Sequence, residues 1–212
     1  IAILGSLEKK ENQKLLKSFT KMSQGKYELN ELNTKKGKFQ HNSGWGIVYK
    51  EKNKFKIYKN IKPIWKDKNS EKFTGKKISL IHARKASIGS KKIENTHPFR
   101  KRYKSKEWFF CHNGTIKDNF PNYKNLEGDT DSEKFFLYLL KNINEKKPIN
   151  SIKTAVKKLK NYTSLNSFLL NKNILYVINK YKKYQRYYTL KILRKDNNII
   201  ISSEVLPEIS TS

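Results

Sequence analysis

The sequence predicts an α+β fold with antiparallel sheets. Segments with helical spacing lie between groups of consecutive strand-like segments, whereas a parallel sheet would need strands and helices in regular alternation. Apolar residues make up only 36% of the 212 residues, but they are clustered rather than diluted. The length suits one domain, so we expect residues 1–212 to form a single unit.

The first half of the chain reads as four strands and one helix. Residues 1–4 form a short apolar run that ends at Gly5, which is typical of a buried strand. Apolar side chains recur at helical spacing through 7–22 and predict a helix, and a polar loop follows at 23–43. Three further strands are expected at 44–49, 54–58 and 77–82, the first two joined by a turn.

The second half begins with a long loop at 85–105, and loops of that length are often functional. A buried strand at 108–111 ends at the Asn113–Gly114 turn. A helix at 131–143 has Thr130 or Asp131 as its cap, with Glu133 in the first turn. We expect a second amphipathic helix at 151–162, and three strands at 167–177, 187–194 and 198–203.

The charge of the chain is strongly unbalanced. Lysine and arginine number 47 against 18 acidic residues, which gives a net charge of +29. Ion-pair surfaces of heat-adapted proteins raise glutamate together with lysine, so they do not explain this excess. A polyanionic partner does, and RNA or the ribosome is the partner we expect. A biased genome and an acidic membrane surface are the competing explanations.

Clusters of basic residues, some interleaved with apolar or aromatic ones, are the candidate nucleic-acid contacts. No zinc-ligand spacing, basic zipper or RNP-like motif accompanies them, so the predicted binding is to phosphate backbone and shape. The candidates are Arg100, Lys101, Arg102, Lys157, Lys158, Lys160, Lys182 and Lys183.

Several classes of protein are excluded by composition. No apolar run approaches the roughly 20 residues of a spanning helix, so we expect no membrane partner. The single cysteine, Cys111, excludes a disulfide scaffold, and no secretory signal is visible, so we expect a cytoplasmic protein. His82 and His112 are too far apart for any metal-site rule, and we expect neither a metal nor a cofactor.

Five motifs stand out, and each alone is weak, because Asn-Gly is a common tight turn and an aspartate before a helix is a common cap. Their order changes the interpretation. Together they resemble the class II glutamine amidotransferases, a family of the Ntn-hydrolase superfamily that releases ammonia from glutamine, and most closely the free-standing members of that family. The motifs are Gly44-Trp45-Gly46, His82-Ala83-Arg84-Lys85-Ala86, Glu94-Asn95-Thr96-His97-Pro98-Phe99, His112-Asn113-Gly114 and Thr130-Asp131-Ser132-Glu133.

The resemblance implies a four-layer αββα sandwich with two antiparallel sheets. It implies that Arg84 grips the α-carboxylate of glutamine and that Asp131 holds the α-ammonium group. The side-chain amide of Asn113 and the backbone N–H of Gly114 would form the oxyanion hole. Trp45 and His97 would support the pocket. One departure is Ser43, which stands where the family has an aspartate.

The family nucleophile is a cysteine at the mature N-terminus, whose own α-amine serves as the base. An ungapped match of Leu4-Gly5 places Ile1 at that position. A match with extra residues places the cysteine just upstream of Ile1, and the sequence leaves both open. We expect Cys111 to act as a small buried residue rather than as a substitute nucleophile.

Two functions therefore compete. One is a class II glutamine amidotransferase-like protein without catalysis, bound to RNA or the ribosome through its basic surface. The alternative is an active free-standing glutaminase with its cysteine just before Ile1. A glutamine-binding regulatory subunit is a third, and glutamine is a candidate ligand in each. Transfer of ammonia would require a partner chain.

Overall fold

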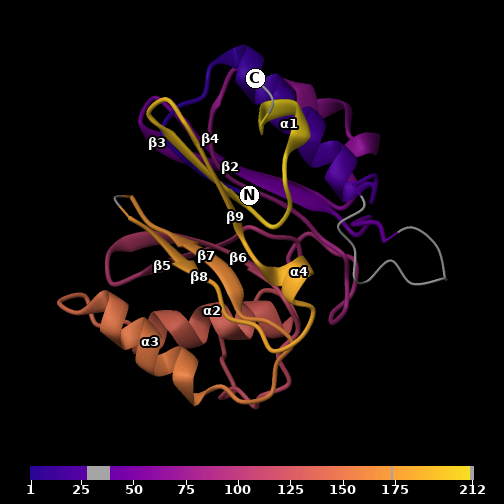
Figure 1. Cartoon of the computed structure of the whole chain (residues 1–212). Helices are drawn as coiled ribbons and strands as arrows, with labels where there is room; N and C mark the ends of the chain where they lie inside the picture. The colour runs from indigo at the N-terminus through magenta and orange to yellow at the C-terminus, as the bar shows by residue number, and fades with distance from the viewer. Residues whose placement is uncertain (28–38, 173, 211–212) are drawn as a thin grey trace.

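The computed structural model describes residues 1–27, 39–172 and 174–210. Its elements form four layers, which from top to bottom of Figure 1 are helices, a six-stranded sheet, a four-stranded sheet and helices. Every pair of neighbouring strands in both sheets is antiparallel. The chain therefore has the α+β architecture that the sequence predicts.

The six-stranded sheet has the order β3-β2-β4-β1-β10-β9. The first strand of the chain is central, because Ala2 lies opposite both Leu80 and Ile201. The two ends of the described chain thus meet in one sheet. Its strands are β1 (Ala2–Leu4), β2 (Trp45–Glu51), β3 (Lys54–Asn60), β4 (Lys77–Ala83), β9 (Lys191–Lys195) and β10 (Asn198–Ser202).

Helices cover the outer face of this sheet. The longest is α1 (Lys9–Ser23), which carries a capping box at Glu8 and Glu11 and packs against the short C-terminal helix α5 (Pro207–Ser210). Two 3-10 helices, η1 (Ile64–Lys66) and η2 (Lys68–Phe73), complete the layer.

The four-stranded sheet has the order β5-β6-β7-β8, with strands β5 (Phe99–Tyr103), β6 (Lys106–Asn113), β7 (Asn166–Leu170) and β8 (Leu175–Ile178). Its outer face is covered by α2 (Asp131–Asn142) and α3 (Pro148–Lys158). Thr130 is the cap of α2, since its Oγ1 accepts a hydrogen bond from the backbone N–H of Glu133. A single turn, α4 (Gln185–Tyr188), lies at the side of the sandwich (Figure 1).

Three apolar clusters fill the three spaces between the layers. Because successive side chains of a strand point to opposite faces, each inner strand supplies two of these clusters. On β2, Ile47 faces the α1 layer and Val48 faces the second sheet, and on β4 the same division separates Ile81 from Leu80. The third cluster joins β6 and β7 to α2 and α3.

The expectation of a loop throughout 85–105 is wrong at residues 99–103, which form β5. Phe99, Lys101 and Tyr103 face α2, while Arg100 and Arg102 point away from it. The charged residues at 100–102 are consecutive, so the alternation typical of a strand is not visible in the sequence. In the structure β5 is an edge strand that turns directly into β6 through the left-handed residues Lys104 and Ser105.

Three other boundaries differ from expectation. The strand expected at 167–177 is a hairpin of β7 and β8, and the start of the strand expected at 187–194 is the helical turn α4. The helix expected at 151–162 begins earlier, at Pro148, and ends at Lys158. Of the loop expected at 23–43, residues 28–38 lie outside the described residues.

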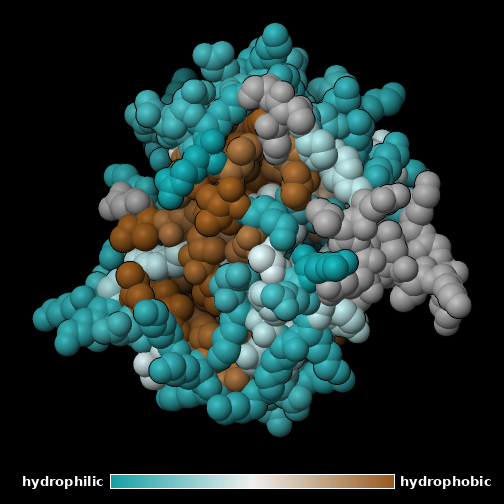
Figure 2. Space-filling view, viewed as in Figure 1, coloured by the Kyte–Doolittle hydropathy of each residue, from teal (hydrophilic) through white to brown (hydrophobic). Residues whose placement is uncertain are grey.

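Figure 2 shows apolar surface gathered between the two sheets on the viewed face, with polar surface above and below it. The exposed apolar side chains include Val177 of β8 and Ile192 of β9, the latter 64% exposed. Among the described helices, none is both long and apolar enough to cross a membrane.

The space between the sheets supplies a stability prediction. Leu80 is completely buried there, so L80A should lower the free energy of unfolding by roughly 2–5 kcal/mol through lost transfer energy and a residual cavity. I192A removes an exposed apolar side chain and should cost less than about 1 kcal/mol. Urea unfolding measures both, and equal costs for the two variants would contradict the described packing.

Candidate functional site

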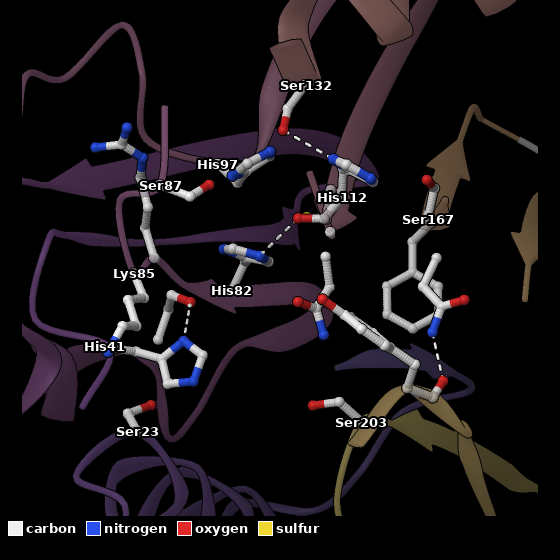
Figure 3. A pocket seen from close by; sticks show the side chains of 18 of the residues that line it. Ser23, His41, His82, Lys85, Ser87, His97, His112, Ser132, Ser167 and Ser203 are labelled. Carbon is white, nitrogen blue, oxygen red and sulfur yellow. Dashed lines mark hydrogen bonds between the residues drawn. The ribbon is translucent and has the colours of Figure 1, made fainter. Parts of the chain in front are cut away.

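A cavity of about 260 Å³ lies where the start of β1, the ends of β4 and β6 and the start of α2 meet (Figure 3). It is lined by residues from all four segments, including Ile1, Arg84, Asn113, Gly114 and Asp131. The sequence assigns seven residues to catalysis or glutamine binding, and six of them line this one cavity: these five and His97. Ser43, which stands where the family has an aspartate, contacts the cavity wall, since its Oγ accepts a hydrogen bond from the N–H of Ala86 at 3.2 Å.

Gly114 sits in a position that only glycine can occupy. Its φ is +152°, and a Cβ atom there would lie 2.1 Å from the carbonyl oxygen of Ser164. The next residues continue this contact, because the Thr115 N–H donates to Thr163 Oγ1 at 2.9 Å and the Thr163 N–H donates to the Thr115 carbonyl at 2.9 Å. The turn after β6 is thus fixed against the segment that leads into β7.

Arg84 is 4% exposed and is held by the loop that follows it. Its Nη1 donates to the carbonyl of Ser90 at 3.1 Å, and its Nη2 donates to the carbonyls of Ile88 and Gly89 at 2.9 and 3.1 Å. Burial lowers the pKa of the guanidinium, and the carboxylates of Asp129 and Asp131 oppose that shift. An arginine remains charged at neutral pH, so the cavity contains a fixed cation.

Asp131 is the first residue of α2 and is 8% exposed. Its Oδ2 accepts the Ile116 N–H at 2.6 Å, and its Oδ1 accepts the Ser132 N–H at 2.9 Å. A carboxylate is favoured in the first turn of a helix, where it faces unpaired N–H groups. Asp131 thus ties α2 to the turn after Gly114 and brings a negative charge to the cavity.

All four histidines of the chain line the cavity. Figure 3 shows His82, His97 and His112 on one wall, where the ring centres of His82 and His97 are 4.4 Å apart. His112 Nδ1 lies 2.8 Å from Ser132 Oγ, and its Nε2 lies 3.0 Å from the Ser164 carbonyl. Both ring nitrogens of His97 are buried without a hydrogen-bond partner in the described part of the chain.

Burial lowers the pKa of every one of these imidazoles. For His41 it lowers the pKa to about 4, although the Ala83 carbonyl opposes the shift. The pKa values of His82 and His97 fall well below 6.5, since burial is reinforced by neighbouring positive charge. The histidine wall is therefore neutral at pH 7, and Arg84 supplies the positive charge beside it.

Trp45 does not line the cavity. Its indole is fully buried, stacks edge-on against Phe73 at 5.8 Å and donates from Nε1 to Asp67 Oδ2 at 3.0 Å. Tyr58 and Asn60 donate to the same carboxylate oxygen, at 2.8 and 2.9 Å. The residue belongs to the core between the six-stranded sheet and its helices.

Ile1 directly precedes β1 and lines the cavity. Its α-amine donates to the Ile81 carbonyl at 2.8 Å, and the Ile81 N–H donates back to the Ile1 carbonyl at 2.9 Å. Burial lowers the pKa of this amine to about 6. The Ile1 side chain is 7% exposed and packs in the cluster beneath α1.

Cys111 also lines the cavity but is 2% exposed, in the apolar cluster between the sheets. Burial raises the pKa of its thiol to about 12. Since the thiolate is the nucleophilic form, this environment is that of a small buried residue rather than of a reactive cysteine.

The sequence interpretation missed Tyr187, Tyr188 and Glu204, which close the cavity on the side of α4 and β10. Tyr187 is hydrogen-bonded to the Asn113 side chain, and burial raises the pKa of its phenol. Burial likewise raises the pKa of Glu204 to about 7. The tyrosines carry no motif signal, because they follow a lysine-rich run and read as the start of a strand.

The basic residues expected to bind nucleic acid lie outside the cavity, in two groups. Arg100, Lys101 and Arg102 are on β5 at the edge of the smaller sheet. The others are at the end of α3 and before α4. Within the described ranges, no group of three or more histidine, cysteine or acidic residues is arranged to hold a metal ion.

Comparison with known families adds a match over most of the chain. Residues 15–175 match the family model described as glutamine amidotransferases class-II. YafJ from Escherichia coli (strain K12) is 33% identical over 119 residues, which cover 51% of this chain and 45% of YafJ. A relative from Haemophilus influenzae is 32% identical over 148 residues, which cover 62% of this chain and 50% of the relative. The matches thus span half or less of these curated relatives.

Solved structures share the fold. The glutamine phosphoribosylpyrophosphate amidotransferase of B. subtilis, in complex with ADP and GMP, has a TM-score of 0.62 over 95% of this chain and 41% of its own, at 17% identity. A predicted glutamine amidotransferase from Pseudomonas aeruginosa has a TM-score of 0.53 over 82% of each chain, at 19% identity. The likeness confirms the expected four-layer, Ntn-hydrolase-like sandwich.

The buried histidines give a pH prediction. In the unfolded chain the histidines bind protons below about pH 6.5, whereas in the folded chain they bind protons only at lower pH. The stability that the neutral histidines contribute is therefore fully present above about pH 6.5 and is lost as the pH falls towards their pKa values in the folded chain. Glu204 acts in the opposite direction, because its pKa is raised. The free energy of unfolding should fall by a few kcal/mol, on the order of 1.4 kcal/mol per proton and pH unit, between pH 7 and 5.5.

Urea unfolding at several pH values measures this slope. H41Q should reduce it by about one proton, because the pKa of His41 is lowered to about 4. A free energy of unfolding that stays constant from pH 7 to 5.5 would contradict the neutral histidine wall.

Proposed function

The chain belongs to the class-II glutamine amidotransferases, and we propose that its cavity binds glutamine. The observation that carries this proposal is the meeting of a fixed cation, a fixed anion and an amide in one cavity of about 260 Å³. Arg84, Asp131 and Asn113 come from three separate segments, and their charges and hydrogen-bonding groups match the α-carboxylate, the α-ammonium and the side-chain carbonyl of glutamine.

Arg84 keeps capacity for a carboxylate. A guanidinium has five N–H donors, and the hydrogen bonds to residues 88–90 use three of them. The loop carbonyls also hold the group in one orientation, which reduces the entropy lost on binding. Asp131 is held in the same way, by the N–H groups of Ile116 and Ser132, and its oxygens have further lone pairs for an ammonium.

Hydrolysis would need two further features. Asn113 and Gly114 would donate to the oxygen that gains negative charge in the tetrahedral intermediate. A thiol at the start of β1 would attack the amide carbon, with an α-amine as base. In this sequence Ile1 stands at that position, and burial keeps the Cys111 thiol protonated. For a polypeptide of these 212 residues we therefore propose binding of glutamine without hydrolysis.

The alternative is an active glutaminase in which a cysteine directly precedes Ile1. The pairing of Ile1 with Ile81 and of Ala2 with Leu80 supports its geometry. A residue before Ile1 that continues this register stands opposite His82, at the floor of the cavity. Any transfer of the ammonia to an acceptor would then use a partner chain.

A second function, association with RNA or the ribosome, is favoured by the charge. The excess of 29 positive charges has no role in binding one glutamine molecule, which has no net charge. Neutralisation of phosphates by lysine and arginine releases counterions and gives strong, salt-dependent binding.

Replacement of Arg84 tests the glutamine proposal. R84Q removes the cation opposite the α-carboxylate, so glutamine affinity in isothermal titration should fall at least about tenfold. R100Q is the matched control, because it makes the same change in an exposed, ion-paired residue of β5. Equal affinity of R84Q and R100Q would contradict carboxylate binding by Arg84.

A measurement of ammonia release distinguishes binding of glutamine without hydrolysis from an active glutaminase. The 212-residue polypeptide should bind glutamine and release no ammonia above the uncatalysed rate, because an oxyanion hole without a nucleophile retains little catalysis. Two variants with an N-terminal cysteine, I1C and a chain with cysteine added before Ile1, show which position can supply the thiol. Ammonia release by the unmodified polypeptide would overturn the proposal of binding without hydrolysis.

A further inference from the structure

Nearly half of the net charge lies in one stretch of the chain without acidic residues. Residues 146–195 contain 14 lysines and arginines and no aspartate or glutamate. Residues 1–145 contain 33 lysines and arginines and 15 acidic residues. The net positive charge per residue is therefore about twice as high in residues 146–195 as in the part of the chain before them. A local excess of positive charge indicates a surface and not only a biased composition.

The fold brings two basic runs of this stretch together. The Lys182 N–H donates to the Thr163 carbonyl at 2.9 Å, and Tyr181 forms a β-bridge with Ser164. The Lys182 ammonium donates to the Lys160 carbonyl. The end of α3 and the segment before α4 are therefore neighbours. Together they form what we call the Lys–Tyr surface, which comprises Lys157, Lys158, Lys160, Tyr162, Lys182, Lys183 and Tyr184.

Aromatic rings lie among these cations. The ammonium groups of Lys180 and Lys182 lie 5.7 and 5.1 Å from the centre of the Tyr162 ring. Tyr184, which follows Lys183 in the chain, is 42% exposed. Lysines that contact phosphates and exposed rings on which bases stack are the two components of surfaces that bind single strands.

Two of the three members of the other basic group, Arg100 and Lys101, are paired with acids. Arg100 Nε donates to Glu107 at 2.6 Å, and the Lys101 ammonium contacts Glu127 at 2.7 Å and Glu133 at 3.8 Å. Asp118 lies beside the Lys–Tyr surface, and its two carboxylate oxygens accept the backbone N–H groups of Lys160 and Asn161 at 2.9 and 2.7 Å. That carboxylate pairs with backbone groups, so the lysine ammonium groups can contact phosphates.

We propose that the Lys–Tyr surface binds single-stranded RNA, with the lysines on the phosphates and Tyr184 stacked on a base. The proposal rests on the association with RNA proposed above and names its place and form. A duplex hides the faces of its bases, so a surface that uses stacking should prefer the single strand.

Fluorescence anisotropy with a labelled 12-nucleotide oligoadenylate measures this binding over a range of salt concentrations. Removal of three phosphate contacts in K157Q/K158Q/K183Q should reduce the log–log salt slope by about 2, at roughly 0.7 per contact. K9Q/K10Q/K17Q is the matched control, because it removes three exposed lysines from α1, in the opposite outer layer (Figure 1), and should leave the slope unchanged.

Stacking is tested separately. Y184A should weaken binding of the oligonucleotide about tenfold, whereas Y184F, which keeps the ring, should bind like the wild type. Binding of a 12-base-pair RNA duplex should be weaker than that of the single strand at equal salt. Tighter binding of the duplex, or equal affinities of Y184A and Y184F, would overturn the single-strand proposal.

The outcomes distinguish the association with RNA from its assignment to the Lys–Tyr surface. If the wild type binds no RNA, both the association and its surface are wrong. If the wild type binds but the two triple variants have equal salt slopes, the association stands and the Lys–Tyr surface is wrong. R84Q should bind RNA like the wild type, so a failure of the glutamine proposal leaves this result unaffected.

Discussion

The approach of Gly114 to the carbonyl of Ser164 is the contact on which the rest of the site depends. A side chain at residue 114 would collide with that carbonyl, which lies 2.1 Å from the position of a Cβ atom. The same carbonyl is 3.0 Å from His112 Nε2, so one backbone oxygen fixes both neighbours of Asn113. The orientation of the residue that would form the oxyanion hole thus follows from backbone packing between β6 and β7.

The segment around Ser164 also connects the cavity with the Lys–Tyr surface. Its Thr163 is paired with Thr115 on the cavity side and with the Lys182 N–H on the outer side. The chain then runs from Lys182 through Tyr184 to Tyr187, whose phenol is hydrogen-bonded to Asn113. Tyr187 lines the cavity and is only three residues after Tyr184, so the single turn α4 connects the Lys–Tyr surface with the cavity wall.

Most of the motif residues meet in one cavity because backbone contacts fix their positions. Arg84, Gly114 and Asp131 stand at strand or helix ends, where neighbouring backbone groups fix them, and all three line the cavity. Trp45 carries an equally clear motif, but the side-chain alternation of β2 places it in the core with Ile47. The elements missed were those whose pattern depends on partners distant in the sequence. β5 is recognisable by its pairing with β6, and Tyr187 of α4 by its hydrogen bond with Asn113.

A crystal structure with glutamine bound tests the central claim most directly. The account predicts the α-carboxylate within hydrogen-bond distance of the Arg84 guanidinium, the α-ammonium at Asp131, and the side-chain carbonyl oxygen at Asn113 and the N–H of Gly114. Glutamine bound in the reverse orientation, or outside the cavity between β1, β4 and β6, would contradict it.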